Sequence, residues 1–275
     1  MLLATVFALA AAALHAGWNL RVKASDDRFV ALWGQFVAAG AVCAAALLLT
    51  GLPERDSWPW LALSATIHVG YVVCLARAYG AGDFSLAYPL ARGGGAMVAA
   101  IGGVAFLDDR LSAIGYLAIL VITGGLVSFI RPSTSWESIR WALVVAVLIG
   151  CYTLADAVGA RRTEGIAYVL GTFVATSITV SVWGLSTGHL ANLRRSLARD
   201  WRGHMTSGLA AAAAYGLVLY AVRWAPVGYV TSLRESSVVL AALAGWKYLA
   251  EGFGRGRVAS ATVVATGLVL LVVAR

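Results

Sequence analysis

Ten stretches of mostly apolar residues follow one another along the chain, and only short polar gaps separate them. A helix needs about 20 such residues to cross a bilayer, and in lipid only helices and closed barrels satisfy every backbone hydrogen bond. Charged residues form 12% of the chain, against about 25% in soluble domains. We therefore expect an all-α integral membrane protein with ten transmembrane helices. The expected spans are Leu2–Leu20, Phe29–Leu49, Pro59–Ala78, Phe84–Phe106, Leu111–Ile130, Trp141–Ala160, Ile166–Ser186, Met205–Val222, Val227–Leu249 and Val258–Ala274.

The gaps between the spans hold most of the basic residues. The net charge of +8 therefore does not indicate nucleic-acid binding, because Lys and Arg in such gaps set the orientation of a membrane protein. The gaps after odd-numbered spans hold more of them, which predicts that both termini lie outside. The longest gap, Thr187–His204, could form a basic surface helix. The cysteines lie in apolar runs without the spacing of zinc ligands, and we expect no metal and no cofactor.

The chain nearly repeats itself at an offset of 142 residues, and several matches in one register argue for a duplication. Each copy would hold five spans, an odd number, so the second copy would enter the membrane upside down. We predict two inverted five-helix repeats, residues 1–131 and 132–275. Such repeats are typical of transporters, whose site lies where the halves meet. The matched pairs are Arg92 with Arg234, Gly103 with Gly245, Asp109 with Glu251, Gly125 with Gly267 and Leu126 with Leu268.

The repeated arginine is a candidate binding group, since a charge at membrane depth is expensive and usually functional. Arg92 shares a helix face with Tyr88, and Arg234 lies in a polar cluster of the ninth span. Guanidiniums from opposite halves could clamp an anion, because each grips a carboxylate or phosphate with two hydrogen bonds. Alternatively, Arg234 pairs with Asp156 or Glu235 and only holds the structure together.

The segment around Arg92 is also rich in helix-weakening residues. Pro89 removes a backbone donor, and glycines weaken a helix and permit a bend. We expect a kinked or partly unwound helix here, which is tolerated at membrane depth where it faces protein or a wet cavity. The predicted hinge consists of Pro89, Gly93, Gly94 and Gly95.

Further polar residues are spaced to share helix faces. His15 and Asn19 lie four apart, and Tyr152 and Asp156 repeat this spacing in the sixth span. A buried histidine alone is more often a core residue, but the mirrored pair favours a cavity role for both. Other candidates for the cavity lining are Ser64, His68, Tyr71 and Tyr215.

Two acids lie within the spans, Asp156 and Glu235. Removing a carboxyl from water favours its protonated form, so either could carry a coupling proton. Each could instead be the ionised partner of an arginine. Asp109 and Glu251 occupy matching turns, where we expect them to cap or pair at helix ends.

Several local motifs are similar to those of a known family. The chain resembles the ten-helix, EamA-type members of the drug/metabolite transporter superfamily over nearly its whole length, although Asp109 stands where a glutamate is usual. The resemblance implies alternating access around a cavity lined by helices one, three, four, six, eight and nine. It also implies cytoplasmic termini, against the charge count, so orientation stays open. The motifs are His15–Asn19 with Lys23, Ala78–Pro89, Phe106–Leu111, Tyr248–Glu251, and the closing Gly125–Leu126 and Gly267–Leu268.

These observations favour a secondary transporter of the inner membrane. The resemblance implies small metabolites such as amino acids, nucleotide sugars and organic phosphates, and the two arginines favour an anionic or zwitterionic one. The expected partners are this solute, the lipid bilayer and, if transport is coupled, protons, but no nucleic acid. The alternatives are a membrane-embedded enzyme and a non-transporting accessory or sensor protein. No histidine pair has metalloprotease spacing and no nucleophile elbow occurs, so we do not expect an enzyme.

Overall fold

The computed structural model describes residues 2–106, 112–130, 134–163, 166–221, 234, 236–252 and 254–273. Within these ranges the chain is almost entirely helical and has no strand. Six described helical segments are long and apolar enough to cross a membrane: α1 (Leu2–Ala24), α2 (Arg28–Thr50), the segment Arg55–Ala81 that contains α3 (Trp58–Ala81), α4 (Phe84–Phe106), α6 (Trp136–Ala160) and α7 (Ala167–Ser186). The others are α5 (Ala113–Ser128), α8 (Leu190–Ala221), α10 (Ser237–Tyr248) and α11 (Gly254–Val273).

The helix called α8 combines two expected elements. The helix begins at Leu190, inside the expected basic gap, and its backbone leaves helical geometry at Asp200 (φ −143°, ψ 43°). Residues 190–199 therefore form a basic surface helix, as predicted, and the apolar part follows the kink. The first seven residues of the expected ninth span, 227–233, lie outside the described residues, and α10 supplies its end.

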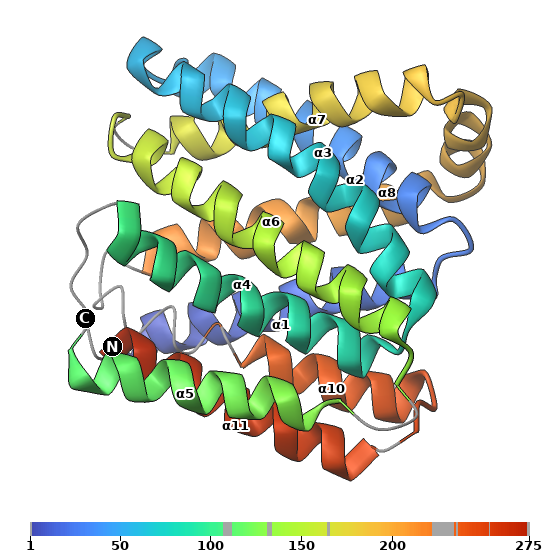
Figure 1. The fold of residues 1–275 in the computed structure, drawn as a ribbon. Helices are drawn as coiled ribbons and strands as arrows, with labels where there is room; N and C mark the ends of the chain where they lie inside the picture. The colour runs from blue at the N-terminus through green and yellow to red at the C-terminus, as the bar shows by residue number, and fades with distance from the viewer. Residues whose placement is uncertain are drawn as a thin grey trace.

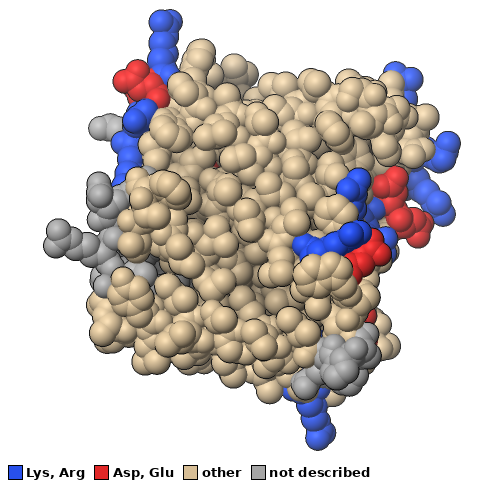
Figure 2. All heavy atoms as spheres, viewed as in Figure 1, with Lys and Arg blue, Asp and Glu red and all other residues tan. Residues whose placement is uncertain are grey.

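The helices form two groups with a middle layer between them (Figure 1). On one side α5 packs against α11, and α10 packs against α4 and α11. On the other side α2 packs against α7, and α3 packs against both α7 and α6. In the middle layer α1 packs against α8, while α6 packs against α3 and α4. The face drawn in Figure 2 has charged side chains at its edges and a broad uncharged area between them, as a lipid-facing surface requires.

The predicted hinge on α4 is an unbroken α-helix in this structure, with Pro89 inside it. Its glycines allow close packing. A Cβ on Gly95 would lie 2.5 Å from Cγ2 of Ile149 on α6, and one on Gly93 would lie 2.7 Å from Cγ1 of Val264 on α11. The helix is therefore not unwound, and bending there during transport stays a prediction.

The first turn of α4 is held by residues far along the chain. Both carboxylate oxygens of Glu251 accept hydrogen bonds, one from the backbone N–H of Phe84 and the other from that of Ser85. The guanidinium of Arg257 donates to Asp83 at 2.6 Å and to the Ser85 hydroxyl at 2.7 Å. The prediction that Glu251 acts at a helix end is confirmed, although the helix is α4 and not its own. Its counterpart Asp109 lies outside the described residues.

Candidate functional site

A cavity of about 370 Å³ lies inside the helix bundle. Arg92 from α4 and Arg234 both line it, so the two arginines matched by the repeat offset share one hollow. His15 and Tyr152 each lie close enough to both guanidiniums to interact with them electrostatically. The other predicted residues that line the cavity are His15, His68, Tyr71, Tyr152, Asp156 and Tyr215.

Two predicted binding residues lie behind this lining. The Tyr88 hydroxyl is 2.8 Å from Nδ1 of His15, and the Asn19 side chain donates to the His15 carbonyl at 2.8 Å. Asn19 in turn accepts a hydrogen bond of 2.7 Å from the Tyr79 hydroxyl. Tyr88 and Asn19 are both buried. The arrangement suits them to fixing the His15 ring rather than to touching a solute.

The acid in the cavity is bonded to a hydroxyl group. Asp156 accepts a hydrogen bond of 3.0 Å from Tyr168. Within the described part of the chain its carboxylate has no ion pair with either arginine. The alternative in which Arg234 pairs with Asp156 is therefore not what the structure shows. The other alternative involves Glu235, which lies outside the described residues.

Aromatic rings make up much of the cavity wall. The His68 ring stacks on Tyr152 with centroids 4.2 Å apart, and Tyr71 meets Tyr152 edge-on at 5.6 Å. Nδ1 of His68 lies 2.9 Å from the Ser64 carbonyl one turn earlier. A mostly apolar wall with a few placed polar groups is typical of small-molecule sites.

The cavity also reaches two helices that the sequence analysis did not include. Gln35 and Phe36 of α2, and Thr172, Phe173 and Thr176 of α7, line it. This corrects the expectation that only helices one, three, four, six, eight and nine contribute. An amide in an otherwise apolar span was the available signal for Gln35. Threonines in a membrane helix commonly bond their own backbone, so Thr176 gave no comparable signal.

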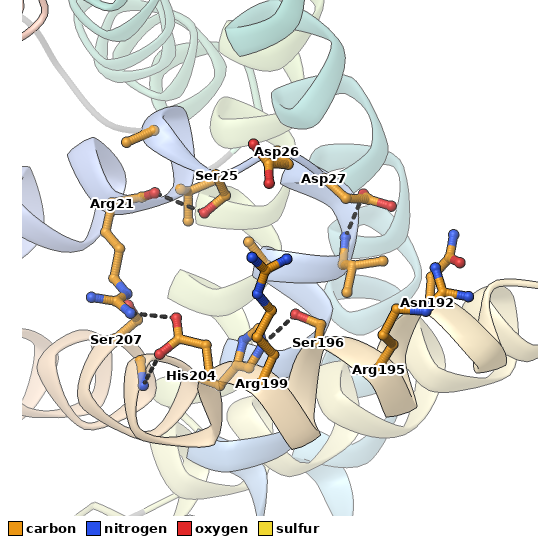
Figure 3. A pocket seen from close by; sticks show the side chains of 16 residues that line it. Arg21, Ser25, Asp26, Asp27, Asn192, Arg195, Ser196, Arg199, His204 and Ser207 are labelled. Carbon is orange, nitrogen blue, oxygen red and sulfur yellow. Dashed lines mark hydrogen bonds and ion pairs between the residues drawn. The ribbon is translucent and has the colours of Figure 1, made fainter.

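A second hollow, of about 720 Å³, opens at the end of α1 (Figure 3). Here Arg21 pairs with Asp200 at 2.5 Å across the kink of α8, and the Asp200 carboxylate also accepts from the Gly203 backbone at 3.1 Å. Nε2 of His204 lies 2.8 Å from the Ser196 hydroxyl. Asp26 and Asp27 of the α1–α2 turn line the same hollow as Arg195 and Arg199 of the basic helix (Figure 3). This hollow is lined by several acidic and several basic side chains, whereas the cavity between the helices has one described acid, Asp156, beside its two arginines.

The comparisons with known proteins concern the sequence and the fold separately. Residues 136–273, half of the chain, match the model of the EamA-like transporter family. A solved crystal structure superimposes with a TM-score of 0.67 at 17% identity, covering 99% of this chain and 98% of the other, which shows a shared fold. No curated protein matches the sequence. The six helical segments that are long and apolar enough to cross a membrane agree with this match. The chain belongs to the EamA-like transporter family of the drug/metabolite transporter superfamily.

Proposed function

We propose that the protein is a secondary transporter of a small anionic or zwitterionic metabolite, working by alternating access in the inner membrane. The family supports a transporter of small molecules in general. The observation that carries the finer proposal is the position of Arg92 and Arg234 on one cavity. Each guanidinium can hold a carboxylate or phosphate with two parallel hydrogen bonds, so a cavity that both arginines line suits an anionic solute.

The size of the cavity limits the solute. A water molecule occupies about 30 Å³ in the liquid, so a cavity of about 370 Å³ holds on the order of a dozen non-hydrogen atoms. Amino acids, hydroxy acids and small organic phosphates fall in this range. In this proposal His15 and Tyr152 orient the solute beside the arginines, and Tyr88 and Asn19 hold His15 in place.

Alternating access needs two halves that can exchange roles, and the helix packing supports such halves. If residues 1–131 and 132–275 are inverted repeats, α1 corresponds to α6, α2 to α7 and α3 to α8. The contact of α3 with α6 then has its counterpart in α8 with α1, and that of α2 with α8 in α7 with α3. Both contacts of each pair are present. The family match also begins at residue 136, close to the proposed boundary. In this transporter ten spans cross the membrane, and α4 bends near Pro89 as the cavity opens.

The acids remain the candidates for coupling. Asp156 lines the cavity with the Tyr168 hydroxyl as its partner, and a hydroxyl can bond either the charged or the protonated form of a carboxyl group. It is therefore suited to bind and release a proton as the solute site opens to either side. Glu235 has the same proposed role.

Uptake by purified protein in liposomes tests the clamp. We expect Arg92→Ala and Arg234→Ala each to lower transport of an anionic solute at least 100-fold, with solutes found by thermal-shift screening of amino acids, hydroxy acids and organic phosphates. Arg77→Ala is the matched control, because Arg77 packs on the Trp141 ring at 4.8 Å and does not line the cavity. If both variants elute as folded protein and transport like the control, the clamp is wrong.

A further inference from the structure

We propose that the α2–α7 wall of the cavity is a second subsite, which hydrogen-bonds a hydroxyl group on the body of the solute. This inference rests on the proposed function, because it specifies the anion that the arginines hold. Its principal residues are Gln35 of α2 and Thr176 of α7, both 1% exposed. The side chains Gln35, Thr176 and Trp18 all line the cavity.

The first observation is a set of polar atoms without partners. Oε1 of Gln35, Oγ1 of Thr176 and Nε1 of Trp18 are buried and have no hydrogen-bond partner among the described residues. Buried polar groups are bonded in the large majority of cases, and each exception costs about 1–3 kcal/mol. Three exceptions around one cavity indicate that their partner enters from the cavity.

The second observation is where these groups lie. Figure 1 shows α2 and α7 on the opposite side of the bundle from α10 and α11, with α4 in the middle beside α6. α2 packs against α7 and α8, whereas α4, which holds Arg92, packs against α6 and α10. A solute whose anionic group meets the arginines would therefore extend the rest of its body toward Gln35 and Thr176.

The hydrogen-bonding chemistry selects the solute group. An indole N–H only donates, an amide oxygen only accepts, and a threonine hydroxyl does both. A single group that serves all of them must therefore both donate and accept, which neither a carboxylate nor an ammonium group can do. A hydroxyl does both with a single oxygen. The rings of Phe36 and Phe173, with centroids 6.4 Å apart, line the same cavity and can cover the carbon skeleton. The geometry thus points to a hydroxylated organic anion.

Matched solutes test the subsite. Three pairs differ by one hydroxyl: serine and alanine, glycerate and lactate, and 3-hydroxybutyrate and butyrate. We expect the wild-type protein to bind the hydroxylated member of at least one pair roughly tenfold more tightly, since a site built for a hydroxyl rejects the analogue that lacks it. Gln35→Leu and Thr176→Val should each bring that ratio close to one while leaving the affinity for the other member unchanged.

A stability measurement separates a binding role from a structural one. Replacing an unpartnered polar group by an apolar one of similar shape should leave the melting temperature of the solute-free protein unchanged or raise it. Thr179→Val is the control, because its hydroxyl bonds the Ala65 carbonyl of α3 at 3.0 Å and the side chain does not line the cavity. We expect this control to lower the melting temperature and to keep the binding ratio.

The outcomes are distinct. If the anions bind but both members of every pair bind equally, or if both variants keep the wild-type ratio, the subsite is wrong and the clamp stands. If Gln35→Leu and Thr176→Val both lower the melting temperature as the control does, the residues are structural and the subsite is wrong. If no anion in any pair binds or is transported, the proposed function fails, and the subsite fails with it.

Discussion

Replacing Glu251 with glutamine changes the group that holds the first turn of α4. In the wild-type protein its two oxygens accept from two successive backbone N–H groups, those of Phe84 and Ser85. A glutamine offers one acceptor oxygen, and its NH₂ group would face the other N–H donor. The variant therefore loses one hydrogen bond and leaves one donor at the helix start unsatisfied.

The magnitude follows from the kind of bond that is lost. A hydrogen bond to a charged group contributes about 1.5–3 kcal/mol, and a negative charge at a helix N-terminus contributes about 0.3–1 kcal/mol. Arg257, whose side chain is 5% exposed, also loses a carboxylate that lies 3.9 Å from its guanidinium but keeps Asp83. We expect a total loss of about 2–4 kcal/mol in the free energy of unfolding, which corresponds to a fall in melting temperature of at least about 4 °C.

Thermal unfolding of the detergent-purified protein measures this loss. Glu137→Gln is the matched control, because Glu137 forms an ion pair of 3.2 Å with Arg140 while their side chains are 60% and 49% exposed. Such surface pairs contribute about 0–1 kcal/mol. Equal melting temperatures for the two glutamine variants would refute the capping role of Glu251.

Three other changes test the packing, the coupling and the motif around Lys23. Gly95→Val should strongly lower the yield of folded protein, because the new side chain would overlap α6. Gly124→Ala should be tolerated, since nothing lies within 4 Å of a Cβ added there. Similar yields of the two variants in gel filtration would contradict this expectation. Asp156→Asn should keep solute exchange but remove the dependence of uptake on a pH gradient, and an unchanged dependence would exclude Asp156 as the proton carrier. Lys23→Met should lower the melting temperature by several degrees, because the ammonium donates to the Tyr79 carbonyl at 2.8 Å; an unchanged value would mean that this bond contributes little.

Helix positions could be predicted from the sequence because a helix needs about 20 mostly apolar residues to cross a bilayer. The expected first span ended at Leu20, yet α1 continues to Ala24. The added turn is stabilised because the Lys23 ammonium donates hydrogen bonds to the carbonyl oxygens of Tyr79 and Gly82 at the end of α3. A partner so distant in sequence cannot be inferred from the charge pattern alone.

The site was accessible from the sequence only in part. The repeat offset paired Arg92 with Arg234, and both line one cavity. Helical spacing predicted which helix face carries Tyr88 and Asn19, but not how far each side chain lies from the cavity surface. Only the structure shows that both lie behind His15. Gln35 was missed because the cavity-lining helices were taken from the resemblance to the family. That resemblance does not show how far the cavity of this chain extends toward α2.

The cap on α4 also has a mechanical consequence. Glu251 comes from the far end of the chain, and the turn it fixes lies about two helical turns before Arg92. If residues 1–131 were expressed alone, the backbone N–H groups of Phe84 and Ser85 would lack the Glu251 carboxylate that accepts from them. The start of α4, and with it the position of the Arg92 guanidinium, would then be less well fixed. A movement of the segment that follows α10 would therefore act on the first turn of α4, so Glu251 joins the edge of the protein to the helix that carries Arg92.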